Sequence, residues 1–155
     1  MRAVVQRVHR AEVRVAGEVV GRIGCGSLVL LGVARTDDPS DAVALAARTA
    51  RLRIFPDEAG RMNLSILEAG GEALVVSQFT LAGDTRRGHR PSFETAAAPE
   101  QAETLYERYV HSLAALGVRV ATGRFRAMME VEMVGDGPVT LILDEPKEPR
   151  EDARP

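Results

Sequence analysis

The chain has 155 residues, of which 45% are hydrophobic and 27% charged, and its formal net charge is -2. These values are typical of one globular domain and exclude intrinsic disorder, which requires low hydrophobicity and high net charge. No apolar run approaches the roughly 18 residues of a membrane span, and arginines interrupt the first residues, so no signal peptide is expected. We therefore expect a reduced, cytoplasmic protein with one domain at residues 1–144.

The basic residues are distributed unevenly. They comprise 19 Arg and a single Lys, a bias that we attribute to genome composition. Residues 1–143 carry 17 acids and 17 bases, so the net charge arises from the end of the chain. Arginines gather in residues 1–22 and 86–90. A neutral body with local basic patches favours a limited contact with nucleic acid.

Strands are predicted where apolar and β-branched residues gather or alternate with polar ones. They are expected at residues 3–8, 12–15, 18–23, 27–33, 73–76, 125–133 and 139–143. The run 27–33 is continuously apolar, which is typical of a strand buried on both faces. The sequence Gly-Asp-Gly-Pro at 135–138 is expected to break the last strand region.

Two helices are predicted. Asp38-Pro39 forms an N-cap with proline in the first helical turn, and the helix is expected to reach about residue 52 with Val43 facing inward. Pro99 starts a second helix that Gly117 ends. The aperiodic segment 82–98 is predicted to be a long loop, and the charged, proline-rich residues 145–155 are expected to form a disordered tail. Together the elements predict an α/β domain with a mixed, mostly antiparallel sheet and two main helices.

The chain lacks the familiar cofactor and metal motifs. It has no glycine-rich dinucleotide motif, no Walker loop and no His-Glu-x-x-His, and its histidines lack the spacing of metal ligands. We expect no cofactor and no metal. Cys25, the single cysteine, lies between two glycines with no histidine beside it, so a structural role is favoured over a nucleophile.

The segment Ser77-Gln78-Phe79-Thr80 directly follows the predicted strand at 73–76. A strand end can present backbone N–H groups and hydroxyls rigidly, as an oxyanion site requires. Thr80 is a candidate nucleophile, and Gln78 a candidate polarising donor. Spacing alone favours the simpler alternative, a strand end with Phe79 in the core and Thr80 as a backbone cap.

Two further segments are candidates for function. A proline between strands belongs at an edge, a bulge or a turn, and the Gly137-Pro138 bond can be cis, although a tight hairpin turn is the simpler interpretation. In the long loop, Arg86, Arg87 and Arg90 form a candidate phosphate contact, because guanidinium groups bind phosphate oxygens in pairs of hydrogen bonds. A solvated surface loop is an equally good interpretation.

Several segments together resemble the D-aminoacyl-tRNA deacylases (DTD type) over nearly the whole chain. They are MRAVVQRV, GEVVGRIG, LRIFPDEAGRMNLS, VVSQFTLAGDTRRGHRPSF and DGPVTLILD. The resemblance implies a DTD-like fold with a barrel-like sheet and hydrolysis of the ester between a D-amino acid and the 3′-terminal adenosine of tRNA. It also implies a cytoplasmic homodimer with the active site at the interface.

The resemblance also implies roles for particular residues. The segment from Ser77 to Thr80 resembles the motif that holds the terminal adenosine and offers backbone amides to the ester. Gly137-Pro138 resembles a Gly-cis-Pro element from the other subunit, whose carbonyls exclude L side chains. Arg7 resembles the arginine that steadies this element, and Met129 a residue that lines the pocket. Arg126 departs from the family, which commonly has glycine there, and is expected to face solvent or RNA.

Selection between D and L substrates by backbone carbonyls has further consequences. Inversion of the α-carbon exchanges the side-chain and hydrogen directions, so a rigid wall can reject one enantiomer. Glycine partly escapes such a filter, so glycyl-tRNA mischarged on tRNA(Ala) is a second expected substrate. Because no His or Lys adjoins Thr80, we expect the 2′-hydroxyl of the terminal ribose to help activate water. A non-catalytic RNA-binding homodimer and a general ester hydrolase using Thr80 or Cys25 remain as alternatives.

Overall fold

The computed structural model describes residues 1–145, and the remainder of the predicted tail, residues 146–155, lies outside the described residues. In chain order the elements are β1 (Arg2–Val15), β2 (Glu18–Ile23), β3 (Gly26–Gly32), α1 (Pro39–Arg51), β4 (Phe55–Pro56), β5 (Met62–Leu64), α2 (Ile66–Ala69), β6 (Glu72–Ser77), the 3-10 helix η1 (Phe79–Ala82), α3 (Pro99–Ala115), β7 (Arg119–Thr122) and β8 (Glu130–Asp144). Glu145 is packed against the domain, because its N–H donates to the Met1 carbonyl at 2.8 Å and its carboxylate accepts from Arg48 at 2.8 Å.

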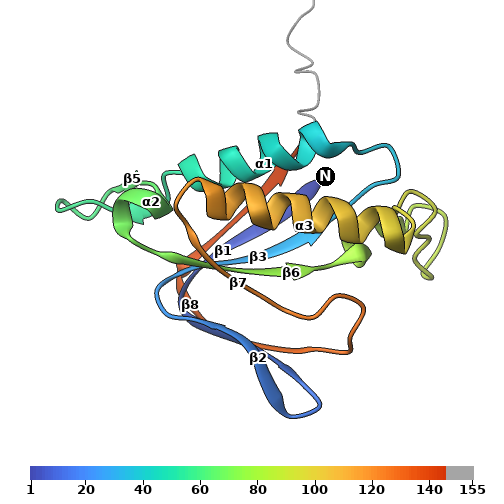
Figure 1. Ribbon diagram of the computed structural model, residues 1–155, viewed down its shortest axis with the longest axis horizontal. Helices are drawn as coiled ribbons and strands as arrows, with labels where there is room; N and C mark the ends of the chain where they lie inside the picture. Colours follow the sequence, from blue (N-terminus) through green and yellow to red (C-terminus); the bar gives the residue numbers. More distant parts are fainter. Residues whose placement is uncertain (146–155) are drawn as a thin grey trace, which may run out of the picture.

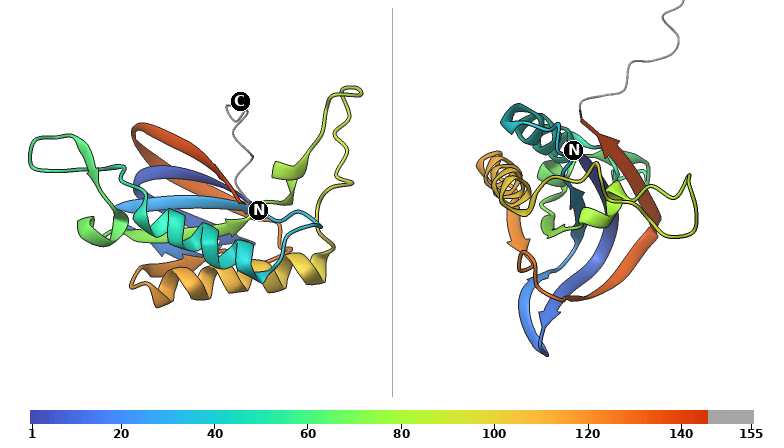
Figure 2. Two further views of the ribbon diagram at one scale, coloured as in Figure 1. Left: turned by 90° about the horizontal axis from the view of Figure 1, so that it is seen from above. Right: turned by 90° about the vertical axis from the view of Figure 1, so that its right-hand side faces the viewer.

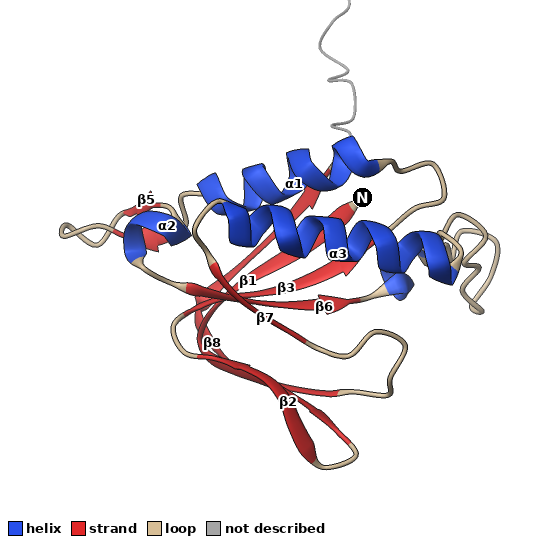
Figure 3. Cartoon of the chain, in the orientation of Figure 1, coloured by secondary structure: helices blue, strands red, loops and turns tan. Residues whose placement is uncertain are grey.

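One mixed six-stranded sheet carries the fold, and α1 and α3 lie side by side across one of its faces (Figures 1 and 3). The strand β1 pairs antiparallel with β2, β3 and β8, whereas β3, β6 and β7 pair in parallel. The sheet curls until β2 contacts β7, so that it nearly closes into a barrel (Figure 2). The predicted α/β class with a mixed, barrel-like sheet and two main helices is confirmed.

The central strands are buried on both faces. In β3, Val29 and Leu31 face a core shared with the helices, whereas Leu28 faces a second core inside the curl of the sheet. In β6, Val75 and Leu74 divide between the two cores in the same way. Alternate side chains of a strand point to opposite faces, so the continuous apolar run predicted at 27–33 fits a strand covered on both sides.

The helix α1 begins where the sequence predicts it. The carboxylate of Asp38 accepts from the N–H groups of Ser40 and Asp41, and that of Asp41 accepts from the Asp38 N–H, which forms a capping box. The prediction that Val43 faces inward was wrong, because Val43 is exposed and the buried stripe contains Thr49 instead. Because this polar residue belongs to the buried stripe, the spacing of apolar residues alone indicates the wrong face of the helix.

Two tyrosines of α3 fix the helices to each other and to the sheet. The Tyr109 hydroxyl donates to Thr49 Oγ1 of α1 at 2.8 Å, and the Tyr106 hydroxyl donates to the Val75 carbonyl of β6 at 2.8 Å. Burial raises the pKa of Tyr106 to about 12, and burial also raises the pKa of Tyr109. Both hydroxyls therefore stay protonated as donors, and Tyr106 holds β6 two residues before Ser77.

The structure differs from the prediction in three further ways. The segment 125–129 is not a strand, because the chain turns here to cross from the β7 edge of the sheet to the β1 side. β8 continues through residues 135–138 without the predicted break. The short strand β7 and the four-residue helix α2 were not predicted. Segments of four residues carry too few apolar positions to show a period.

Candidate active site

The segment predicted to carry chemistry forms an exposed turn at the end of β6. The Gln78 N–H donates to the Leu31 carbonyl at 2.8 Å, which anchors the turn to β3 before η1 begins. The Gln78 side-chain amide donates to Thr80 Oγ1. Phe79 is 58% exposed, so the interpretation that placed it in the core was wrong. Within residues 1–145, no histidine, lysine or carboxylate hydrogen-bonds to Thr80.

A cavity of about 610 Å³ opens beside this turn. Its walls come from the ends of β3 and β6, the first residues of α3 and the segment 125–129 that precedes β8. Ser77, Gln78 and Phe79 line it, and Met129 lines it as the resemblance implied, whereas Thr80 lies outside the lining. Most of the wall is apolar, with Phe125 resting against the anchored Tyr106 at 5.9 Å between ring centroids.

Gly137-Pro138 forms a bulge in β8, and the bond between the two residues is cis. Gln6 pairs with Thr140 and Val8 pairs with Gly135, so residues 136–139 of β8 all lie opposite Arg7 alone. The hairpin interpretation was wrong, whereas the expectation of an edge or a bulge is confirmed, since within residues 1–145 the one pairing partner of β8 is β1. Gly137 has φ +127°, and a Cβ there would lie 2.8 Å from the Val139 N, so the position excludes a side chain.

Arg7 holds this bulge. Its side chain is 12% exposed and forms an ion pair with Asp136 at 3.1 Å between Nε and Oδ2. Its Nε also donates to the Asp136 carbonyl at 3.3 Å, and its Nη1 donates to the Ile54 carbonyl at 2.6 Å. One guanidinium group therefore ties the residue before Gly137 to the segment that follows α1. The implied steadying role of Arg7 is consistent with these contacts.

Within one chain, the two candidate segments do not meet. Gly137 and Pro138 are exposed and do not line the cavity that Ser77 and Gln78 line. The same strand exposes several large apolar side chains: Val131, Val134, Leu141 and Ile142. A free strand edge with exposed apolar residues is typical of a surface that another chain covers.

The loop after η1 projects from the body of the domain (Figure 2). In this loop Arg86 forms an ion pair with Asp84 at 2.6 Å, and hydrogen bonds from Arg86 lower the pKa of Asp84 to about 2. Arg87 and Arg90 are exposed, and neither has an acidic partner within the described residues. Of the three arginines predicted to contact phosphate, these two carry uncompensated charge.

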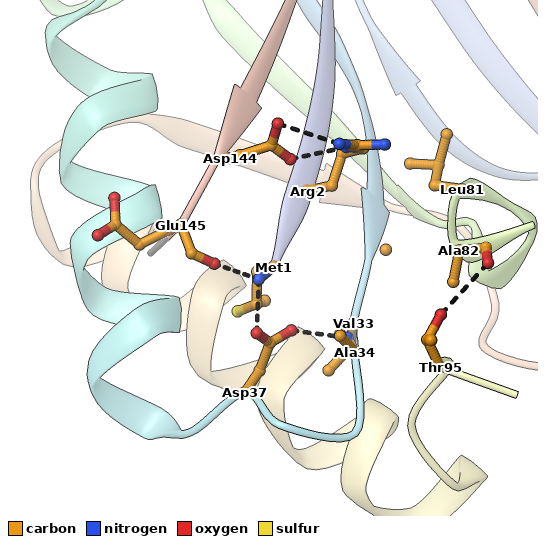
Figure 4. Close-up of a pocket in the computed structure, with 11 residues that line it drawn as sticks. Met1, Arg2, Val33, Ala34, Asp37, Leu81, Ala82, Thr95, Asp144 and Glu145 are labelled. Carbon is orange, nitrogen blue, oxygen red and sulfur yellow. Dashed lines mark hydrogen bonds and ion pairs between the residues drawn. The ribbon is translucent and has the colours of Figure 1, made fainter. Parts of the chain in front are cut away.

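A second, smaller cavity of about 240 Å³ lies near the N-terminus (Figure 4). Its polar groups are paired with one another. The Met1 ammonium contacts Asp37 at 2.7 Å, and the other Asp37 oxygen accepts from the Ala34 N–H at 2.6 Å. Because these groups satisfy each other, we assign the cavity a structural role.

Other predicted features lie apart from the large cavity. Cys25 is exposed and does not line the cavity. The part of the chain that the structure describes contains no group of three potential metal-ligating side chains. Across residues 1–145, none of the helices has the length and apolar character needed to cross a membrane.

The fold is a small single-domain α/β architecture with a barrel-like sheet, and the relatives of this chain are hydrolases that act on aminoacyl-tRNA. The family model described as D-Tyr-tRNA(Tyr) deacylase matches residues 4–144. A D-aminoacyl-tRNA deacylase of Symbiobacterium thermophilum is 63% identical over 147 residues, covering 95% of this chain and 97% of the relative. That of Anaeromyxobacter dehalogenans is 62% identical over 144 residues, covering 93% and 97%. The chain belongs to the D-aminoacyl-tRNA deacylase family.

Solved structures agree with this fold. A c-Myc DNA Unwinding Element Binding Protein is 39% identical, with a TM-score of 0.89, and the match covers 95% of this chain and all (100%) of that chain. A probable eukaryotic D-amino acid tRNA deacylase is 19% identical with a TM-score of 0.80, over 92% of this chain and 97% of that chain. The second likeness supports the fold alone.

Proposed function

We propose that the protein hydrolyses the ester bond between a D-amino acid and the 3′-terminal adenosine of tRNA, releasing free tRNA and the D-amino acid. Family membership supports the reaction. The observation that carries the proposal for this chain is the anchored turn from Ser77 to Thr80 beside a cavity of about 610 Å³. Cavities of this size suit drug-sized ligands, the scale of an adenosine that carries one amino acid.

The backbone N–H groups of the turn are the proposed hydrogen-bond donors for catalysis. Phe79 and Thr80 are the first residues of η1, so their N–H groups have no acceptor inside that helix. Such donors stabilise the oxyanion that forms when water attacks the ester carbon. The water oxygen ends in the carboxyl group of the amino acid, and the 3′ oxygen of the ribose leaves with a proton.

The 2′-hydroxyl of the terminal ribose is the proposed aid to the attacking water. The Thr80 hydroxyl accepts a hydrogen bond from Gln78 and has no base among its described contacts. A threonine hydroxyl without a base is a poor nucleophile at neutral pH. Thr80 is therefore assigned to substrate positioning, and no covalent acyl-enzyme is required.

Chiral selection is assigned to a homodimer in which the partner's Gly137-Pro138 bulge enters the cavity. Three features of β8 support this arrangement: its free edge, its exposed apolar side chains and a bulge in which residues 136–139 lie opposite one residue of β1. Backbone carbonyls of the bulge inside the cavity would meet the side chain of an L-amino acid and spare that of a D-amino acid. The reaction is assigned to the cytoplasm, where aminoacyl-tRNA is used.

Contacts with the tRNA backbone are assigned to the projecting loop. Arg87 and Arg90 carry uncompensated charge and are the stronger candidates for phosphate contacts. Arg86 is a weaker candidate, because a phosphate must compete with Asp84 for its guanidinium group.

Ester release from D-tyrosyl-tRNA and L-tyrosyl-tRNA tests the proposal. We expect the D ester to be cleaved at least about 100-fold faster, a difference of about 2.7 kcal/mol in transition-state binding. Glycyl-tRNA on tRNA(Ala) should be cleaved at a measurable rate, because glycine has no side chain for the wall to reject. Negligible rates for both enantiomers would leave a non-catalytic RNA-binding homodimer. Cleavage of esters that lack the ribose, abolished by a thiol reagent, would indicate a general hydrolase that uses Cys25.

A further inference from the structure

Arg126 has an unusual backbone conformation. Its φ is +64°. Within residues 1–145, one other non-glycine residue has a positive φ: Ala16, in the turn between β1 and β2. The Ala127 N–H donates to the Arg124 carbonyl at 3.2 Å, which closes a tight turn around Arg126. A left-handed conformation costs a non-glycine residue free energy that glycine avoids. The turn by itself therefore favours glycine, and the arginine is retained at a cost to folding.

Arg126 also has an unusual electrostatic position. It lines the large cavity and is exposed, so it lies at the mouth. Among the described residues that line the cavity, it is the only one with a charged side chain. No acidic side chain of residues 1–145 forms an ion pair with it. An uncompensated guanidinium beside an otherwise neutral pocket is positioned to bind an anion.

The proposed substrate has anions at one end only. Its amino acid is esterified and carries an α-ammonium group, which a guanidinium group repels. The cavity has room for about one aminoacylated nucleoside, so the phosphodiester chain must begin at the mouth. A cation at the mouth attracts the phosphate end and repels the ammonium end, which orients the substrate with its ester inside.

We propose that Arg126 is a positioning residue that binds a backbone phosphate of the tRNA 3′ end where it leaves the cavity. This inference rests on the proposed deacylase activity. It differs from the loop contacts of Arg87 and Arg90, because Arg126 lines the cavity itself, at its mouth.

The test compares two substrates and two matched variants. Arg126→Gln removes the charge, and Arg124→Gln removes an exposed arginine two residues away that does not line the cavity. For Arg126→Gln, kcat/KM on D-tyrosyl-tRNA should fall about tenfold, since a charge-assisted hydrogen bond is lost. On D-tyrosyl-adenosine, which has no phosphate, kcat/KM should not change. Arg124→Gln should match the parent protein on both substrates.

Two further measurements separate a phosphate contact from a structural role. The dependence of log KM on log salt concentration should become shallower by about 0.7 for Arg126→Gln, the contribution of one phosphate on a single strand. Arg126→Gly should raise Tm by about 3 °C, because the strain of the turn is relieved, while kcat/KM on the tRNA still falls. Stability and tRNA affinity should thus change in opposite directions.

Three outcomes would overturn the inference: equal losses on both substrates, an unchanged salt dependence, or a lower Tm together with lower activity for Arg126→Gly. If the parent protein itself fails to cleave D-tyrosyl-tRNA, the proposed function fails instead. The two failures are therefore distinguishable in the same set of assays.

Discussion

Two regions of the molecule differ in how completely one chain satisfies them: the core under α1 and α3, and the cavity at the ends of β3 and β6. Under α1 and α3, side chains such as Leu45 are fully buried, and the tyrosine hydroxyls find partners within the chain. On the cavity side, Phe79 and Met128 are 58% and 91% exposed, and Arg126 has no acidic partner among the described residues. The core under the helices is complete in one chain, whereas the side chains around the cavity are left without partners in one chain. Stability should therefore depend on the helix-covered core and activity on the cavity.

The largest expected effect is a loss of stability in the helix-covered core. Leu45→Ala should lower the free energy of unfolding by about 3 kcal/mol, because it leaves a cavity in a core where Leu45 is 0% exposed. Chemical denaturation measures this loss, and the activity per folded molecule should be unchanged. Met128→Ala, at a 91% exposed position, should change stability by less than about 0.5 kcal/mol. A similar loss of stability for both variants would contradict the distinction between the helix-covered core and the cavity.

In the β8 bulge, Gly137→Ala should lower kcat/KM on D-tyrosyl-tRNA by about 100-fold, which corresponds to about 2.7 kcal/mol. The added Cβ would lie 2.8 Å from Val139 N and displace the bulge. Gly60→Ala is the matched control, because Gly60 also has positive φ (+77°) but open space around it. The control should lose about 1 kcal/mol of stability and keep its activity. Full activity of Gly137→Ala would exclude the bulge from the site.

Arg7→Ala should have a smaller effect, about a tenfold loss of kcat/KM, with reduced discrimination between D and L esters. The variant removes the Arg7 ion pair to Asp136 and the Arg7 hydrogen bond to the Ile54 carbonyl, so the bulge loses its position but not its shape. The ratio of D to L rates measures the effect. A drop in Tm with an unchanged ratio would indicate a purely structural role.

The smallest expected effect is that of Thr80→Ala. It should keep kcat within about threefold of the parent, since a hydroxyl without a base contributes little as a nucleophile. Single-turnover kinetics on D-tyrosyl-tRNA measure the chemical step directly. Near-complete loss, or a trapped acyl-enzyme in the parent protein, would reverse the assignment and make Thr80 the nucleophile.

Local patterns predicted much of the scaffold. The Asp38-Pro39 cap, the start of α3 at Pro99 and the doubly buried strand at 27–33 all match the structure, because each depends on neighbouring residues alone. Val43 was placed on the wrong face because Thr49, paired with Tyr109, interrupts the apolar stripe. The strand expected at 125–133 was partly wrong because apolar residues there line a cavity, which imitates the alternation of a strand.

The sequence by itself determined where α1 and α3 begin and which central strand is buried on both faces, since these preferences arise within a few residues. It also indicated the two candidate segments at Ser77 and Gly137, though not their surroundings. Only the tertiary structure decided that the first opens onto a cavity, that the second is a bulge held by Arg7, and that the two are apart in one chain. These facts depend on contacts between residues more than 50 positions apart in the chain. The near-zero net charge is an average over the chain and says nothing of local charge. Only the fold decided that Arg126, which has no acidic partner among the described residues, lies at the mouth of the cavity.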